Sequence, residues 1–189
     1  MPFIIPAQWG GNRTGVALCF KKNSMAKQTI AIAGAERKMG SLVTRKLLHL
    51  DQYRILILTE GGAPVSLPQE WRMPNAGTGP EIVDCLKDGC WEADMIVLDI
   101  PVASIQEAAD KIREVSTQKI IFVVSGDTGE AADPAATWRN LLPNAKTVVA
   151  LNLLNSTATP LDRTDEESLD SIGTVAGSLG FETIIQSKN

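Results

Sequence analysis

The sequence predicts a three-layer, doubly wound α/β fold, in which a mostly parallel β-sheet forms one domain with helices on both faces. From residue 25 onward, short apolar runs rich in β-branched residues alternate with amphipathic stretches, which is the pattern of β-α-β units. Several runs are apolar at consecutive positions, as expected for strands that helices cover on both sides. A chain of 189 residues, 44% of them hydrophobic, is long enough to bury one such core.

The strands are expected where the apolar runs occur. They are residues 29–33, 53–59, 81–83, 93–100, 119–124, 147–151 and 181–185. Helices are expected at residues 39–50, 102–115 and 165–179; in the first two, the apolar side chains recur along one stripe. Segment 61–80 is rich in glycine and proline and predicts a loop.

The first 24 residues do not follow this alternation. They contain two prolines and a glycine pair, and their apolar runs are too short for the core of a signal peptide. From Met25 the sequence continues as MAKQTIAIAGA, which is typical of the start of a cytosolic protein. We therefore expect residues 1–24 to be a poorly ordered or spurious extension rather than a packed first strand, and residues 25–189 to form the domain.

Charge and rare residue types exclude several functions. Eighteen Lys and Arg against 22 Asp and Glu give a formal net charge of −4, which disfavours binding to the phosphate backbone of nucleic acids. One histidine and three cysteines without a C-x-x-C pair predict no metal site. No apolar stretch approaches the roughly 20 residues of a membrane span, and free thiols fit a reducing compartment. A cytoplasmic protein with small-molecule partners is expected.

The segment IAIAGAERKMGSLVT carries the clearest functional signal. A strand runs into Gly34 and a helix begins near Gly40, so that backbone N–H groups and the helix dipole face a bound anion. The spacing fits G-x-x-G-x-x-G with Arg37 at the middle position, which favours the pyrophosphate of a dinucleotide in a Rossmann domain. Arg37 either blocks the approach of the pyrophosphate or supplies a cation to it. A plain strand-to-helix turn with solvated Arg37 and Lys38 is the alternative.

Two acidic residues bear on the choice of cofactor. Glu60 ends the second expected strand, where it would hydrogen-bond an adenosine ribose and favour NAD, unless it is a plain exposed strand end. Arg37, Lys38 or Arg72 could instead hold the 2′-phosphate of NADP, so the choice between NAD and NADP stays open. Asp99 lies in an otherwise apolar strand. It either faces the cofactor or, as we favour, accepts hydrogen bonds from the loop after the fifth strand.

Four segments follow one another in a familiar order: TIAIAGAERKMG, ADMIVLDIPVASIQEAADKI, KIIFVVSGD and WRNLLPNAKTVVALNLL. Over residues 27–185 the chain resembles the NADP-dependent oxidoreductase family that includes NADPH:coenzyme F-420 (deazaflavin) reductase. Similar loops open the N-terminal domains of prephenate dehydrogenase and pyrroline-5-carboxylate reductase, which carry a further helical domain. Because this chain ends at Asn189, the compact deazaflavin-reductase type is the expectation.

The resemblance implies a set of cofactor contacts. Residues at the first turn would face the dinucleotide phosphates, those after the fourth strand would border the ribose and nicotinamide, and those after the fifth and sixth strands would line the hydride-accepting side. In that order they are Gly34, Ala35, Arg37, Lys38, Met39 and Gly40, then Ile100, Pro101 and Val102, then Ser125 and Asn152.

The implied activity is transfer of a hydride between NADP or NAD and a second acceptor, with coenzyme F-420 as the deazaflavin candidate. Such a transfer depends on the geometry of two bound cofactors more than on acid–base groups, so no catalytic side chain is assigned. The alternatives are a non-catalytic dinucleotide-binding module and a degenerate relative that lacks its substrate domain. The resemblance also implies a homodimer.

Overall fold

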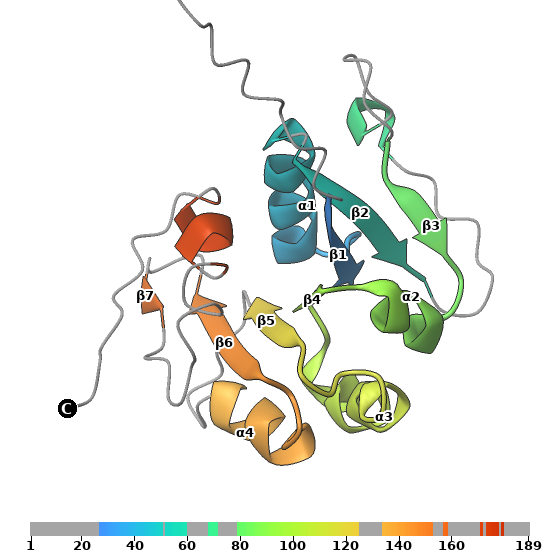
Figure 1. The fold of residues 1–189 in the computed structure, drawn as a ribbon. Helices are drawn as coiled ribbons and strands as arrows, with labels where there is room; N and C mark the ends of the chain where they lie inside the picture. The colour runs from blue at the N-terminus through green and yellow to red at the C-terminus, as the bar shows by residue number, and fades with distance from the viewer. Residues whose placement is uncertain are drawn as a thin grey trace, which may run out of the picture.

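The computed structural model describes residues 27–50, 52–59, 68–71, 79–124, 134–152, 157–158, 171, 173–177 and 179. Their strands form one seven-stranded sheet with the order β3-β2-β1-β4-β5-β6-β7 (Figure 1). All neighbours from β3 to β6 pair in parallel, and only β6 and β7 are antiparallel. The predicted doubly wound α/β fold is therefore confirmed.

Six of the seven expected strands are present, with ends that differ by up to two residues. The strands are β1 (Gln28–Ala33), β2 (Tyr53–Leu58), β3 (Glu81–Val83), β4 (Met95–Leu98), β5 (Ile120–Val124), β6 (Thr147–Asn152) and β7 (Thr157–Ala158). The two-residue strand β7 was not predicted, because it is too short to show an apolar run. The expected strand at residues 181–185 and the expected extension at residues 1–24 lie outside the described residues.

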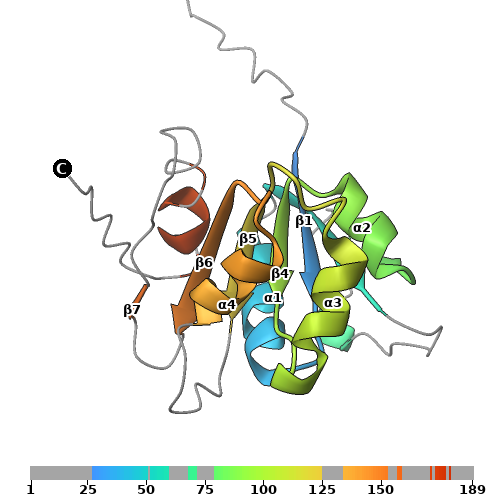
Figure 2. The ribbon, with the colours of Figure 1, turned by 90° about the horizontal axis from the view of Figure 1, so that it is seen from below.

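The helices divide between the two faces of the sheet. They are α1 (Lys38–Leu50), α2 (Leu86–Glu92), α3 (Ile105–Ile112) and α4 (Pro134–Leu141), with single 3₁₀ turns η1 (Gln69–Trp71) and η2 (Val102–Ser104). Figure 2 shows α3 and α4 in front of the sheet and α1 behind it. The expected helix at residues 102–115 is split into η2 and α3, and α4 was not predicted. Of the expected helix at residues 165–179, the described residues 173–177 are helical.

Alternate residues of β1 supply the two cores. Ile30 and Ile32 pack with Val43 and Leu47 of α1 on one face. Ala31 and Ala33 point to the other face, where α2, α3 and α4 lie. β1 is buried at every position from Thr29 to Ala33, and the run from Ile30 to Ala33 is accordingly apolar without alternation.

The order of the strands creates a switch point between β1 and β4. From β1 the chain moves outward to β2 and β3 on one side, then crosses back to β4 and continues to β5 and β6 on the other. The loops that leave β1 and β4 therefore diverge above the carboxyl ends of the strands, where sheets of this kind bind ligands. None of the helices in the described ranges is long and apolar enough to cross a membrane.

Candidate functional site

The turn between β1 and α1 is closed by glycine and by backbone hydrogen bonds. Gly34 follows β1 with φ of +79°, a conformation that side chains disfavour. The Arg37 N–H donates to the Gly34 carbonyl at 3.0 Å, and the Ser41 N–H donates to the Arg37 carbonyl at 2.7 Å. A Cβ on Gly34 would lie 2.1 Å from the Asp99 carbonyl oxygen, and one on Gly40 would lie 2.1 Å from the Gly34 carbonyl oxygen. Both glycines are therefore required by the close approach of β1, α1 and the end of β4.

The side chain of Asp99 lies at the amino end of α1. The residue directly follows β4 and is 5% exposed. Its Oδ2 accepts the Gly40 N–H at 2.9 Å, and its Oδ1 accepts the Arg37 Nε–H at 3.1 Å. An aspartate carboxylate therefore lies where the dipole and N–H groups of a helix attract anions.

A cavity of about 420 Å³ opens beside this carboxylate, at the carboxyl ends of β1, β2 and β4. Apolar walls come from the strand ends and from α2 and α3, and charged groups come from the β1–α1 turn, Asp99 and α3. The lining residues are Ala33, Gly34, Glu36, Arg37, Leu58, Thr59, Leu86, Asp99, Ile100, Pro101, Ser104, Glu107 and Ala108. The volume suits a ligand of nucleotide size.

Acidic residues outnumber basic residues in the described wall of the cavity. Among the described lining residues, Glu36, Asp99 and Glu107 are acidic and Arg37 is the only basic one. Arg37 is 42% exposed at its side chain and is already paired with Asp99. Glu107 pairs with Lys111 one turn further along α3, at 2.9 Å, and this lysine keeps the pKa of Glu107 below its ordinary value.

The structure brings four of the predicted contacts together at the cavity. They are Gly34, Arg37, Ile100 and Pro101, from the β1–α1 turn and the segment after β4. Gly40 is buried behind them, and its N–H faces Asp99. These positions agree with a binding site at the switch point, and the contacts themselves stay predictions.

The other predicted contacts lie elsewhere or are not described. Ala35 and Met39 are buried in the core on the α1 side of the sheet. Lys38 is exposed, and Val102, in η2, is 78% exposed; neither lines the cavity. Glu60, Arg72 and Ser125 lie outside the described residues, and Asn152 ends β6 with a side chain that is not described.

Asp99 has two partners that the sequence analysis did not name. They are Arg37 and Gly40, from the turn after β1. The predicted hydrogen bonds from the loop after the fifth strand fall on residues 125–133, which lie outside the described residues, and stay a prediction. A carboxylate directly after a fully buried strand was the available signal. Within the described ranges, no group of three or more His, Cys, Asp or Glu residues is arranged to hold a metal ion.

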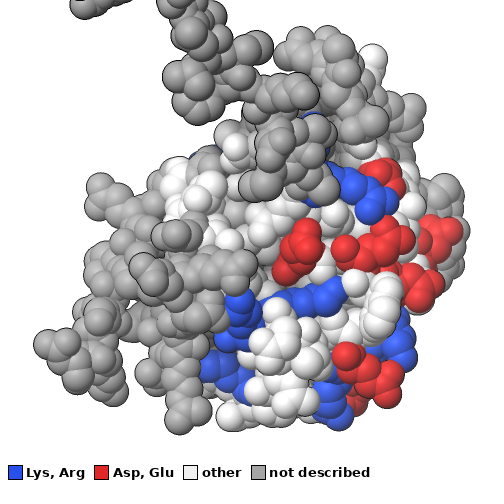
Figure 3. Space-filling model, viewed as in Figure 1, with Lys and Arg blue, Asp and Glu red and all other residues white. Residues whose placement is uncertain are grey.

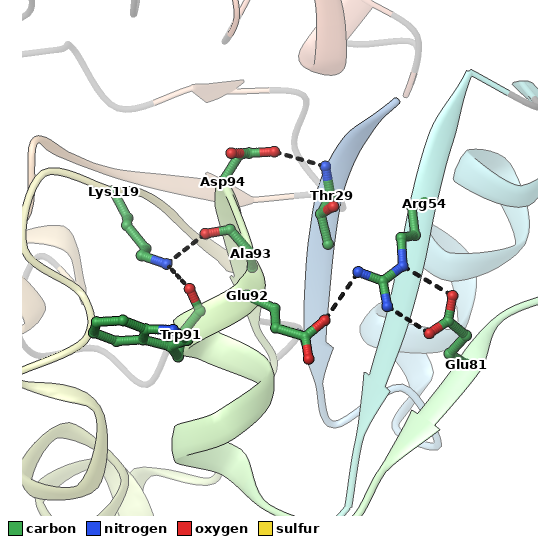
Figure 4. A network of polar contacts seen from close by, with 8 residues as sticks. All are labelled: Thr29, Arg54, Glu81, Trp91, Glu92, Ala93, Asp94 and Lys119. Atoms are coloured by element: carbon green, nitrogen blue, oxygen red, sulfur yellow. Dashed lines mark hydrogen bonds and ion pairs between the residues drawn. The ribbon is translucent and has the colours of Figure 1, made fainter. Parts of the chain in front are cut away.

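The opposite end of the sheet carries a second cavity, of about 410 Å³, with a different organisation. The Lys119 ammonium donates to three carbonyl oxygens at the end of α2, those of Cys90 (2.7 Å), Trp91 (2.6 Å) and Ala93 (2.6 Å). Burial lowers the pKa of Lys119 from its ordinary value. Asp94 Oδ2 accepts the Thr29 N–H at 2.8 Å (Figure 4). These polar groups therefore bind the backbone of the protein itself.

Arg54 joins three elements at the same end. Its Nη2 lies 2.6 Å from Glu81 Oε2 of β3, and its Nη1 lies 2.9 Å from Glu92 Oε2 of α2. Figure 4 shows the guanidinium between the two carboxylates. In Figure 3, acidic side chains gather in the middle of this face, with basic side chains above and below them. On this face Arg54 is paired with two glutamates, whereas Lys119 and Asp94 bind backbone groups.

Comparison with known proteins identifies the fold. No protein-family model and no curated protein matches the chain. Pyrroline carboxylate reductase from Plasmodium falciparum, solved with NADP bound, has a TM-score of 0.59 at 10% identity. The match covers 87% of this chain and 59% of the reductase. A variant imine reductase from Myxococcus stipitatus, in complex with NAD⁺, has a TM-score of 0.56 at 15% identity. The match covers 81% of this chain and 52% of the imine reductase.

A third solved structure is matched over nearly its whole length. The N-terminal domain of HmdIII from Methanocaldococcus jannaschii has a TM-score of 0.57 at 12% identity, covering 84% of this chain and 99% of that domain. The chain thus spans between half and three-fifths of the two reductases. At these identities the likeness concerns the fold alone, and it shows that the chain has a Rossmann-type fold.

Proposed function

We propose that the chain binds a nicotinamide dinucleotide and serves an oxidoreductase reaction, transferring a hydride between that cofactor and a second acceptor. The observation that carries the proposal is the cavity of about 420 Å³ at the switch point, between the Gly34 turn and the Ile100–Pro101 segment. Doubly wound sheets bind dinucleotides at this place. The NADP and NAD⁺ bound to the reductases of similar fold support the same class of ligand.

The residues present fit such a cofactor, apart from one competing group. Leu58 and Leu86 offer apolar surface beside the end of β2, where the adenine half of a dinucleotide lies in this fold. Arg37 and the first amides of α1 would hold the phosphates. When bound, the nicotinamide supplies the hydride donor or acceptor, and the chain positions it and excludes water. The competing group is the Asp99 carboxylate.

Charge at the cavity favours NAD over NADP. The 2′-phosphate of NADP adds negative charge, and Glu36 and Asp99 already place carboxylates in the wall. Arg37, the one basic residue among the described lining residues, is bound to Asp99 at 3.1 Å. We therefore propose NAD as the cofactor, because the neutral 2′-hydroxyl meets no such repulsion.

The sequence resemblance alone supports a choice of acceptor and assembly. On that basis the proposed acceptor is a deazaflavin such as coenzyme F-420, and the proposed assembly is a homodimer. An oxidised deazaflavin accepts the hydride that NADH donates, and a proton from solvent completes its reduction. The transfer therefore requires the two rings to face each other in a dry pocket.

Thermal unfolding of the full chain with and without nucleotide tests the proposal. NADH at about 100 times its Kd should stabilise the fold by about 2.7 kcal/mol, a shift of several degrees. NADPH should give a smaller shift at the same concentration. No shift with either nucleotide, up to about millimolar concentration, contradicts dinucleotide binding.

A matched pair of variants locates the binding site. Ser104→Trp places an indole inside the cavity wall and should abolish the shift. Val102→Trp places the same side chain on the same 3₁₀ turn, at a position that is 78% exposed, and should leave the shift intact. NADH oxidation with a deazaflavin acceptor then separates an enzyme from a binding module, since a module would bind without turnover.

A further inference from the structure

We infer that Asp99 sets the affinity of the cavity for phosphate-bearing ligands, as a built-in anion that competes with the cofactor's pyrophosphate for the amino end of α1. The inference rests on the proposed function and identifies a specificity-determining residue within that site. It predicts that the carboxylate penalises dinucleotides and nucleoside diphosphates, and that uncharged nucleosides escape the penalty.

The position of the carboxylate follows from β4. Asp99 is the first residue after this strand, and its own N–H donates to the Ala33 carbonyl at 3.0 Å, which holds it beside the end of β1. The residue is 5% exposed. The backbone therefore fixes the carboxylate against the β1–α1 turn, and a change of rotamer does not carry its charge far from the site.

Both carboxylate oxygens engage the groups that a pyrophosphate needs. The Gly40 N–H belongs to the first turn of α1, where the helix itself provides no acceptor, and it donates to Oδ2 at 2.9 Å. The Arg37 Nε–H donates to Oδ1 at 3.1 Å, and Arg37 is the only basic residue among the described cavity-lining residues. A phosphate that binds this turn must displace Asp99 from these donors or share them with it.

A buried carboxylate also repels a second anion placed beside it. Screening by solvent is weak at a site where the charge is 5% exposed, so the repulsion acts on each phosphate charge. Adenosine carries the same base and ribose without any phosphate and needs neither Arg37 nor the Gly40 amide. The ratio of ADP affinity to adenosine affinity therefore isolates the effect of Asp99.

A purely structural role for Asp99 predicts a different result. If the carboxylate served only to cap α1, its removal would lower the melting temperature and change ADP and adenosine binding alike. If it competes with phosphate, its neutralisation changes the ratio of the two affinities in favour of ADP. The two roles are thus separated by the ratio, whatever happens to stability.

Calorimetric titration of the full-length chain with NADH, ADP and adenosine tests the inference. Asp99→Asn keeps the size of the side chain and an oxygen that can accept the Gly40 N–H, and removes the charge. Affinities for NADH and ADP should rise about tenfold or more, while that for adenosine should change by less than about twofold. Asp99→Ser, a smaller side chain, should act in the same direction and serves if the asparagine variant does not fold.

Asp94→Asn is the matched control. Asp94 lies at the other end of β4 and also accepts a backbone N–H, that of Thr29 at 2.8 Å, but it does not line the cavity at the switch point. Its neutralisation should leave all three affinities unchanged. The unaltered chain gives a further readout that needs no variant, since ADP should bind it no more tightly than adenosine does.

Each remaining outcome bears on one claim or on both. Equal affinity of the unaltered chain and both Asp99 variants for NADH overturns the inference and leaves the proposed function in place. No binding of NADH by any of the three chains overturns both. Binding of NADH by the Asp99 variants alone supports the inference and overturns the proposed function, because the aspartate then keeps the unaltered chain from binding a dinucleotide.

Discussion

One aspartate directly precedes strand β4 and another directly follows it, and the two aspartates have different surroundings. Asp94 precedes the strand, is exposed, and accepts the N–H of Thr29 at the start of β1. Asp99 follows the strand, is 5% exposed, and accepts the N–H of Gly40 together with the Nε–H of Arg37. The same residue type thus forms part of a surface network at one end of the sheet and part of a buried site at the other.

The surroundings of the two aspartates explain the difference. At the amino end, the Lys119 ammonium binds three backbone carbonyls and Arg54 binds two glutamates, so these side chains join elements of the fold. At the carboxyl end, three carboxylates and one arginine line the cavity, and this arginine is the partner of Asp99. Polar groups that join elements stabilise a fold, whereas an excess of one charge in a concave site selects ligands.

The largest expected effect is at the carboxyl end, from Gly34→Ala. The new Cβ would lie 2.1 Å from the Asp99 carbonyl oxygen, and alanine would have to adopt φ of +79°. Because the contact is with backbone, a side-chain rotation cannot relieve it. Chemical denaturation should show a loss of more than about 3 kcal/mol in the free energy of unfolding, or no folded protein.

Gly177→Ala provides the comparison for this variant. Gly177 lies among helical residues, and a Cβ built there meets nothing within 4 Å among the described atoms. Alanine should be neutral or slightly stabilising at this position, because its helix propensity is higher than that of glycine. A loss for Gly34→Ala as small as that for Gly177→Ala would contradict the tight packing of the β1–α1 turn against the end of β4.

A smaller loss is expected at the amino end, from Lys119→Met. The substitution keeps much of the apolar stem and removes three hydrogen bonds of 2.6–2.7 Å from the ammonium to carbonyls at the end of α2. The free energy of unfolding should fall by about 2 kcal/mol. The shift in melting temperature that NADH produces should remain, since Lys119 does not line the cavity at the switch point.

Lys87→Met controls for the loss of a lysine as such. Lys87 pairs with Glu114 at 2.7 Å, and both side chains are exposed. Its replacement should scarcely change stability, because solvent screens such pairs. A loss for Lys87→Met as large as that for Lys119→Met would contradict the structural role assigned to the three carbonyl contacts.

The sequence was sufficient to predict the fold because local patterns determine it. Consecutive apolar runs mark strands covered on both faces, and an apolar stripe marks α1. Helix α4 has eight residues and opens on Pro134–Ala135–Ala136, so it offered no comparable stripe. Strand β7 has two residues and depends on its pairing with β6, which is a tertiary contact.

The site was predictable only in part, for a different reason. Gly34 and the segment after β4 could be placed, because parallel strands bring their carboxyl ends to one edge of the sheet. The partners of Asp99 could not, since Arg37 and Gly40 precede it by 62 and 59 residues. A charge after a buried strand indicates a polar partner and does not identify it.

The smallest expected effect concerns Arg54→Gln at the amino end. Arg54 bridges β3 and α2 through Glu81 and Glu92, but the side chains are 40–50% exposed. The loss of stability should be about 1 kcal/mol or less, and should shrink in about 1 M salt. The bond to Arg54 lowers the pKa of Glu81 below its ordinary value of 4.5. The contribution of this ion pair to stability is therefore present above pH 4.5 and is lost as the pH falls through the lowered pKa. Urea unfolding at neutral and acidic pH measures the difference in stability between Arg54→Gln and the unaltered chain. If this difference persists when Glu81 is protonated, Arg54 acts through packing and not through its charge.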